Sequence, residues 1–204
     1  MSDVNVKKEF SEFGGKIFTI AILTVISFIL GIISWFISVV SIIQIIFFIV
    51  IFIFFIMALG NLKSIAYALN NQNIHEFRSK IILSFIFLFI GSFFFWLPLI
   101  FLFSLGAPGV LWAWIIIFLF LVIGIIFLII AAIMRLLAWS QLEKFFTNNV
   151  SLFPQNISDD AKAGAKLCKI GAILDITIIL GVIGEILRIV GYFKLASLRN
   201  LTGD

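Results

Sequence analysis

The chain reads IFTIAILTVISFILGIISWFISVVSIIQIIFFIVIFIFFIMALGNL from residue 17 to residue 62, and none of these positions carries a charged side chain. A second charge-free run extends from residue 81 to residue 134. The two runs are about 46 and about 54 residues long, whereas one helix that crosses a bilayer needs roughly 20 apolar residues. Each run is therefore long enough for two spans and too long for one. The sequence predicts an all-α, polytopic integral membrane protein.

Each charge-free run contains a turn signal near its middle. Ser34, Ser38 and Ser41 interrupt the first run, and the segment SLGAPG at 104–109 divides the second, because Gly and Pro together are strong turn signals. A further apolar segment follows near the C-terminus, so we expect five transmembrane helices. Their predicted bounds are 17–37, 41–62, 81–103, 110–137 and 170–193. They would form a single transmembrane bundle over 17–199, between a cytoplasmic N-terminal tail, 1–16, and a C-terminal tail, 200–204.

Tryptophan residues mark the expected membrane interfaces. Trp35, Trp96, Trp112 and Trp114 lie near the two turns, and Trp139 lies near the opposite end of the fourth helix. Because Trp is enriched at both membrane–water interfaces, we expect the first four at one membrane surface and Trp139 at the other.

The basic residues predict the orientation. With five spans, eleven Lys and Arg residues between Lys7 and Lys169 fall on the side of the N-terminus, and the two short connections opposite contain none. Cytoplasmic loops carry an excess of Lys and Arg, so we expect a multi-pass protein of the plasma membrane with its N-terminus in the cytoplasm. The tail breaks this rule, because Arg188, Lys194 and Arg199 would fall on the opposite side.

Two interpretations of the segment 170–193 remain open. A straight helix of about 24 residues would be near 36 Å long at 1.5 Å per residue, and it would place the tail outside. A re-entrant hairpin that closes near Gly181 would keep the tail inside and would let Asp175 face Arg188. However, its arms would be short, and its turn would need shelter from lipid. We favour the straight span.

Asp175, Glu185 and Arg188 are the ionisable residues expected at membrane depth. Charges there are costly unless they pair or face away from lipid. Glu185 and Arg188 are three apart on a helix and can form a structural pair. The alternative is that Asp175 acts as a proton or cation relay.

The segment from Ser158 to Lys169 is predicted to be a cytoplasmic helix continuous with the fifth span. Ser158 followed by two Asp residues is a helix-start signal. Lys162, Lys166 and Lys169 share one face of this helix, where they would fix the orientation and contact lipid headgroups. The net charge of +4 reflects such membrane-flanking residues, so we expect no nucleic-acid partner.

The residue types also limit the chemistry. One cysteine, Cys168, cannot form an intrachain disulfide, and one histidine, His75, cannot supply the paired axial ligands of a membrane haem. The sequence has no glycine-rich phosphate loop and no histidine cluster, and its two charge-free runs contain no acid pair. We therefore expect no catalytic, cofactor-binding or metal-binding residues, no cofactor and no enzymatic activity.

The segments AYAL at 66–69, KIGAIL at 169–174 and VGYFKL at 190–195, with Phe77-Arg78, resemble small polytopic membrane protein families of unknown function that are common in archaea. The resemblance implies an archaeal plasma membrane and no catalytic activity. We interpret the chain as a non-enzymatic structural or accessory membrane component. Its expected partners are the lipid bilayer and either other membrane subunits or a second copy of itself. The alternative is a small transporter or channel-like protein that uses Asp175.

Overall fold

The computed structural model describes residues 3–34, 36–37, 40–105, 111–177 and 180–201. The regular elements over these residues are all helices, which confirms the all-α prediction. The α-helices are α1 (Asp3–Ser34), α2 (Val40–Leu69), α3 (Gln72–Leu105), α4 (Leu111–Asn148), α5 (Gln155–Ile176) and α6 (Gly181–Leu195). Two short 3-10 helices are η1 (Val150–Leu152) and η2 (Ala196–Asn200).

Over the described residues, four helices are long and apolar enough to cross a membrane, namely α1 to α4. Their candidate spans are Val6–Ser34, Ile42–Leu69, Gln72–Ile100 and Trp114–Asn148. The first four predicted helices fall on these elements. However, α1 begins at Asp3 rather than at residue 17, because Val6, Phe10 and Phe13 of the expected tail form a stripe that is buried against the bundle.

The prediction of a fifth, straight span at 170–193 is wrong. This segment is divided between the end of α5 and α6, which pack against each other as an antiparallel hairpin. With 15 residues, α6 is about 22 Å long at 1.5 Å per residue, which is too short for a bilayer core of roughly 30 Å. The hairpin interpretation, which the sequence left as the second choice, is the one that the structure has.

Glycine residues explain why this segment turns back on itself. A Cβ atom added at Gly171 would lie 2.7 Å from the carbonyl oxygen of Gly184, and one at Gly191 would lie 2.6 Å from the Sγ atom of Cys168. Gly164 likewise has no room for a Cβ, because the carbonyl oxygen of Gly191 would lie 2.6 Å away. The glycine residues therefore allow the two arms of the hairpin to pack closely against each other.

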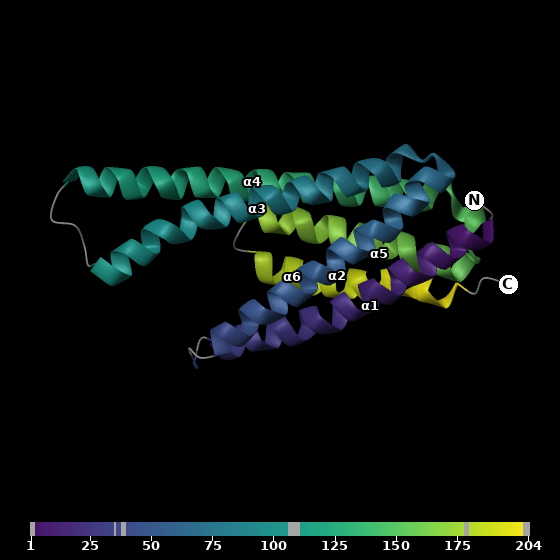
Figure 1. Ribbon diagram of the computed structural model, residues 1–204, viewed down its shortest axis with the longest axis horizontal. Coiled ribbons are helices and arrows are strands. Elements are labelled where there is room, and N and C mark those ends of the chain that lie inside the picture. The colour runs from purple at the N-terminus through teal and green to yellow at the C-terminus, as the bar shows by residue number, and fades with distance from the viewer. Residues whose placement is uncertain (1–2, 35, 38–39, 106–110, 178–179, 202–204) are drawn as a thin grey trace.

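Three helical hairpins make up the molecule (Figure 1). The hairpins α1–α2 and α3–α4 are long. The last residues of α1 and α3 and the first residues of α2 and α4 lie at the same end, on the left of the view, which we call the turn end. The start of α1 and the end of η2 lie at the opposite end, which we call the terminus end. The shorter α5–α6 hairpin begins at the terminus end, where α5 packs on α4 and α6 packs on α1. The predicted turns at 38–40 and 104–109 lie mostly outside the described residues.

The core lies at the terminus end and is rich in aromatic rings. Phe10 stacks on Phe145 at 5.7 Å between ring centroids and meets Phe153 edge-on at 5.0 Å. Trp139 packs between Phe77 at 5.1 Å and Tyr192 at 6.0 Å, and only 1% of its surface is exposed. Rings from α3 and α6 therefore cover Trp139, and its level in a membrane stays a prediction.

Local signals set the bounds of α3 and α5. Asn70 has a positive φ of 45°, and the Asn71 side chain accepts hydrogen bonds from the backbone N–H groups of Asn73 and Ile74 at 3.0 and 3.3 Å. These residues end α2 and cap the start of α3. By contrast, α5 begins at Gln155 rather than at Ser158. Pro154, whose φ is fixed, starts the helix one turn earlier.

Candidate functional site

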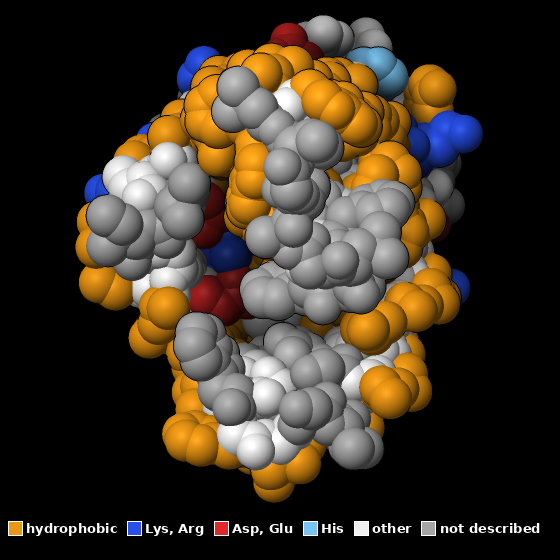
Figure 2. Space-filling view, turned by 90° about the vertical axis from the view of Figure 1, so that its left-hand side faces the viewer, with side chains coloured by type: hydrophobic (Ala, Val, Ile, Leu, Met, Phe, Trp, Pro, Cys, Tyr) orange, Lys and Arg blue, Asp and Glu red, His pale blue; other side chains and the backbone are white. Residues whose placement is uncertain are grey.

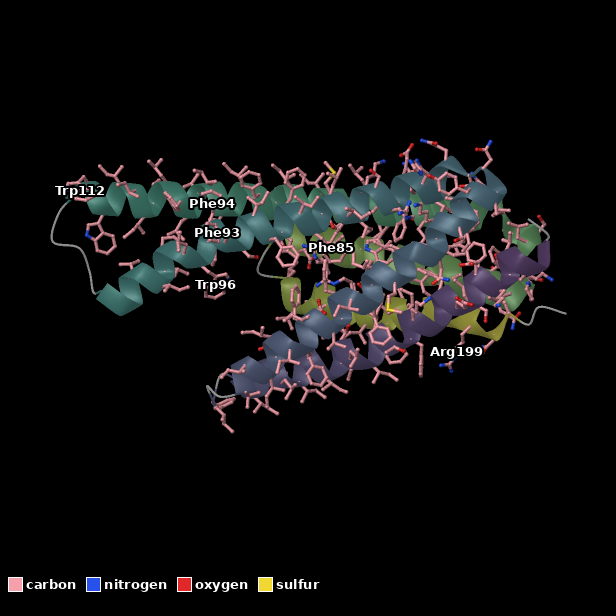
Figure 3. All side chains as sticks on the ribbon, viewed as in Figure 1. Phe85, Phe93, Phe94, Trp96, Trp112 and Arg199 are labelled. Atoms are coloured by element: carbon pink, nitrogen blue, oxygen red, sulfur yellow. The ribbon has the colours of Figure 1, made fainter. Side chains whose placement is uncertain are left out.

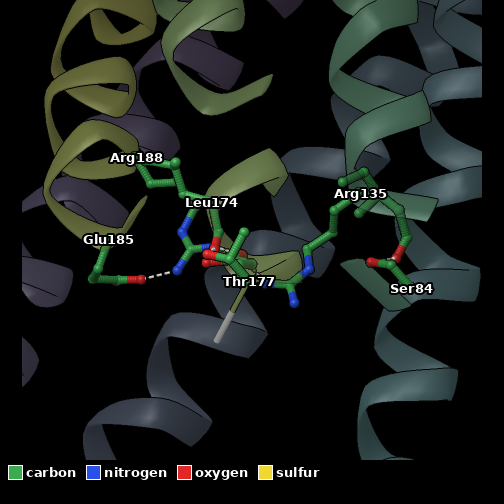
Figure 4. A network of polar contacts seen from close by, with 8 residues as sticks. Ser84, Arg135, Leu174, Thr177, Glu185 and Arg188 are labelled. Carbon is green, nitrogen blue, oxygen red and sulfur yellow. Dashed lines mark hydrogen bonds and ion pairs between the residues drawn. The ribbon is translucent and has the colours of Figure 1, made fainter. Parts of the chain in front are cut away.

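Four charged residues meet near the tip of the α5–α6 hairpin (Figure 4). Asp175 lies in the last turn of α5, Glu185 and Arg188 lie on α6, and Arg135 lies on α4. The carboxylate of Asp175 forms ion pairs with Arg188 and, at 3.1 Å, with Arg135. Glu185 forms a second ion pair with Arg188. We call these four residues the ionic cluster.

The ionic cluster is shielded and electrically balanced. The side chains of Asp175 and Arg188 are 11% and 12% exposed, whereas those of Arg135 and Glu185 are 22% and 29% exposed. Two guanidinium groups and two carboxylates leave no net charge. Because an isolated buried charge is strongly unfavourable, this balance lets the cluster join α4, α5 and α6 at a position surrounded by apolar helices.

The sequence identified three members of the ionic cluster and missed the fourth. The predicted pair of Glu185 with Arg188 is confirmed. The contact of Asp175 with Arg188, expected only for a hairpin, is also present. Arg135 was interpreted as a membrane-flanking residue. The available signal was its position inside the predicted fourth helix, directly after the charge-free run.

A cavity of about 290 Å³ lies beside the ionic cluster. Figure 2 shows a hollow between the helices, with basic and acidic side chains at its base. The walls are mainly apolar side chains from α2 and α3, and the polar groups come from α1, α3, α4 and α6. The lining residues are Thr24, Ser27, Phe48, Ile51, Phe52, Phe55, Ile81, Ser84, Phe85, Leu88, Arg135, Trp139, Glu185, Arg188 and Tyr192.

The hydroxyl groups in the cavity wall are partly occupied by their own helices. Thr24 donates to the carbonyl oxygen of Ile20, and Ser84 donates to that of Ile81, each at 2.7 Å. This is the back-bonding that Ser and Thr commonly form in helices. Over the described residues, no group of three or more His, Cys, Asp or Glu side chains is placed to hold a metal ion. The chemistry of the cavity is therefore that of guanidinium, carboxylate and hydroxyl groups beside aromatic walls.

The three lysines predicted on one face of α5 separate into two groups. Lys169 forms an ion pair with Glu143 of α4 at 2.6 Å, whereas Lys162 and Lys166 are exposed. The three lysines differ because Lys169 faces Glu143 of α4 and is partly shielded by that contact. Lys162 and Lys166 thus keep the exposure that contact with lipid headgroups requires, and Lys169 has a structural partner.

A second polar group joins α1 to α2 nearer the terminus end. Lys16 donates to the side-chain oxygen of Asn61, and the amide of Asn61 donates to Glu9 at 2.7 Å and to Glu12 at 3.0 Å. Lys16 directly precedes the charge-free run. This group therefore marks the level at which the apolar part of the bundle begins.

The chain was compared with known proteins by sequence and by fold. No family model, no curated protein and no solved structure matches it.

Proposed function

We propose that the chain is an integral membrane protein with four spanning helices and a re-entrant α5–α6 hairpin, with both termini in the cytoplasm. Four apolar helices of sufficient length support the spans. With the hairpin turning back, all 14 Lys and Arg residues belong to the terminus end or to the hairpin and the helix beside it. The sequence between residues 35 and 62 and between 81 and 134 contains none. The violation of the charge rule by the tail thereby disappears.

The depth of the hairpin follows from one contact on α6. Phe193 meets Phe18 of α1 at 6.0 Å between ring centroids, and Phe18 lies two residues inside the charge-free run. From this level to Gly181 is about 18 Å along the helix, so the tip would reach the middle of a hydrocarbon core of roughly 30 Å. Arg188 would lie about 8 Å deep.

Within this placement, we propose that the protein is a non-enzymatic structural or accessory membrane component. The observation that carries this proposal is the double ion pair of Asp175, whose carboxylate is shared by guanidinium groups from α4 and α6. Re-entrant segments are stable only where protein shields their polar groups. The ionic cluster would supply this shielding by holding the hairpin against α4, and it would leave the apolar outer faces of α1 to α4 for lipid, other subunits or a second copy.

The alternative is a small transporter or channel-like protein that uses Asp175. A re-entrant hairpin beside a cavity at membrane depth favours it, since transporters build binding sites from such elements. However, Asp175 does not line the cavity, and its carboxylate is already engaged by two guanidinium groups. Its geometry therefore supports a joining role better than a proton-relay role.

Cysteine labelling tests the proposed topology. Cys168 is buried and is first replaced by Ala. Asn200→Cys, at an exposed position of η2, should react with an impermeant maleimide only after the cells are lysed. A cysteine at the neighbouring Ser197 would be a poorer probe, because the hydroxyl oxygen of Ser197 is buried. Phe36→Cys is the matched control at the turn end, where Phe36 is 85% exposed, and it should react in intact cells. Reaction of Asn200→Cys in intact cells would contradict the proposal.

A further inference from the structure

The cavity separates a charged floor from an apolar wall. Arg135, Glu185 and Arg188 line it on the side of the hairpin, and Phe52, Phe55 and Phe85 line it on the side of α2 and α3. These rings meet edge-on, with Phe52 at 5.3 Å and Phe55 at 5.4 Å from Phe85. A molecule that fits both sides must carry a polar head and an apolar chain.

The guanidinium group of Arg135 selects the chemistry of the head. The ionic cluster as a whole carries no net charge, but its two guanidinium groups are not equally paired. Arg188 contacts two carboxylates, whereas Arg135 only shares the Asp175 carboxylate with it. In addition, the Nε–H group of Arg135 is buried and has no hydrogen-bond partner. A buried donor of this kind is costly to leave unsatisfied. An acidic group in the cavity, which Arg135 lines, would be positioned to pair with this guanidinium.

The position of the cavity selects a membrane lipid over a soluble anion. In the proposed topology, Arg188 lies about 8 Å below the level at which the hairpin enters the apolar layer, within reach of headgroups on the cytoplasmic side. The hollow opens between the two long hairpins toward the turn end (Figure 2). A chain that follows the phenylalanine wall would therefore continue into the apolar gap between those hairpins.

We propose that this cavity binds an acidic lipid of the cytoplasmic leaflet, with its headgroup at Arg135 and one acyl chain along the phenylalanine wall. The cavity volume of about 290 Å³ is near the lower end of the range of roughly 300–1,000 Å³ for small-molecule pockets. It accommodates the head-proximal part of one chain, and the remainder lies in the bilayer. The proposal rests on the membrane topology proposed above and goes beyond it by assigning a ligand.

Trp139 supplies a reporter, because it lines the cavity. A variant that keeps Trp139 and carries Phe at the other four tryptophan positions is reconstituted into vesicles of phosphatidylcholine. Brominated phosphatidylglycerol or brominated phosphatidylcholine is then added at equal mole fraction, since bromine on an acyl chain quenches nearby tryptophan. The acidic lipid should quench Trp139 at a several-fold lower mole fraction than the zwitterionic lipid does.

Two substitutions separate the site from general attraction to the surface. In the reporter background, Arg135→Gln removes the proposed headgroup contact and should weaken the preference about tenfold, the effect of one charge-assisted hydrogen bond. Lys63→Gln removes an exposed charge of the same sign and should leave the preference unchanged. Equal quenching by the two lipids, or loss of the preference in Lys63→Gln but not in Arg135→Gln, would overturn the proposal.

A second variant keeps the test valid if Arg135→Gln does not fold. Ser27→Leu fills the cavity from α1 without touching the ionic cluster, and it should reduce quenching of Trp139 by brominated phosphatidylglycerol. Unchanged quenching in Ser27→Leu would contradict the site. Displacement of the brominated lipid by millimolar inorganic phosphate would show that the cavity takes a soluble anion instead. The labelling of Asn200→Cys reports the topology independently, so a failure of lipid binding is distinguishable from a failure of the proposed function.

Discussion

The two ends of α4 differ in burial: Trp139 and Phe145, toward the terminus end, have 1% and 0% of their surface exposed, whereas Trp112 and Phe118, toward the turn end, are 64% and 65% exposed. Figure 3 shows Trp112 at the turn end. All four side chains are large and mainly apolar, so residue type does not explain the difference. At the terminus end, α5 and α6 fill the space between the two long hairpins, and at the turn end they are absent. The shared core therefore depends on the short α5–α6 hairpin and not on the apolar content of the helices.

Close contacts within a single hairpin also occur toward the turn end. A Cβ added at Gly124 of α4 would lie 2.8 Å from the backbone nitrogen of Phe95 of α3, and Phe94 packs against Phe120 at 5.4 Å. In a bilayer, lipid tails are as apolar as the exposed side chains, so their exposure carries little penalty there. The two ends therefore differ in the kind of neighbour that their side chains require.

The largest expected change in stability comes from replacing a tryptophan at the terminus end and comparing it with one at the turn end. Trp139→Ala should lower the free energy of unfolding by about 3–5 kcal/mol, because it leaves a cavity in the shared core. Trp112→Ala, at the exposed turn end, should change it by no more than about 0.5 kcal/mol. Thermal unfolding in detergent measures both. Similar losses in the two variants would show that the turn end is also packed against protein.

The second effect concerns the ionic cluster that fastens the short hairpin. Arg188→Met leaves Glu185 without its partner, and such a loss in a buried pair typically costs about 3–5 kcal/mol. The same unfolding measurement applies, with Lys162→Met at an exposed position as the control. Adding Glu185→Gln to Arg188→Met should recover most of the loss, because Asp175 keeps Arg135. Failure of this rescue would mean that Arg188 acts through packing rather than charge.

The third effect tests the close contact between α5 and α6. Gly171→Ala should lower the free energy of unfolding by about 1–3 kcal/mol, since the added Cβ would overlap the backbone of Gly184. Gly60→Ala is the matched control, because a Cβ there meets nothing within 4 Å, and it should be neutral or stabilising by up to about 1 kcal/mol. A loss in Gly60→Ala as large as that in Gly171→Ala would count against the hairpin contact.

The four long helices were predictable because a bilayer span has a local signature. The runs 17–62 and 81–134 lack charge over their whole length, and the Asn-rich break after α2 is a local turn signal. The length of α1 was not predicted, because burial of Phe10 depends on its contacts with Phe145 and Phe153 far along the chain. Local patterns therefore located the spans but not their extensions into the core.

The hairpin and its site depend on contacts between distant residues. The composition of 170–193 suits both a straight span and a hairpin, and the contact of Gly171 with Gly184 decides between them. Arg135 was missed because a basic residue after an apolar run usually flanks a membrane, and its partner Asp175 is 40 residues away. The burial of Trp139 was not predicted for a related reason, since an amphipathic ring suits both an interface and a core.

The smallest expected effect concerns the ion pair of Lys194 with Asp160, which also joins α6 to α5. The Nζ and Oδ1 atoms are 2.7 Å apart, closer than Arg135 and Asp175 at 3.1 Å, yet the two side chains are 40% and 47% exposed. Solvent screens such a pair, so we expect a coupling energy of no more than about 1 kcal/mol. A double-mutant cycle with Lys194→Gln and Asp160→Asn measures it by thermal unfolding in detergent.

The salt dependence of the coupling energies distinguishes the exposed ion pair of α6 from its shielded one. Raising the ionic strength to about 1 M shortens the Debye length to about 3 Å, and it should abolish the coupling of Lys194 with Asp160. The coupling of Arg188 with Glu185, measured by the corresponding cycle, should persist because shielded pairs are screened much less. If both couplings vanished in salt, the ionic cluster would be open to water, and its role in fastening the hairpin would have to be abandoned. If both persisted, the terminus end of α6 would be shielded by neighbours beyond this chain.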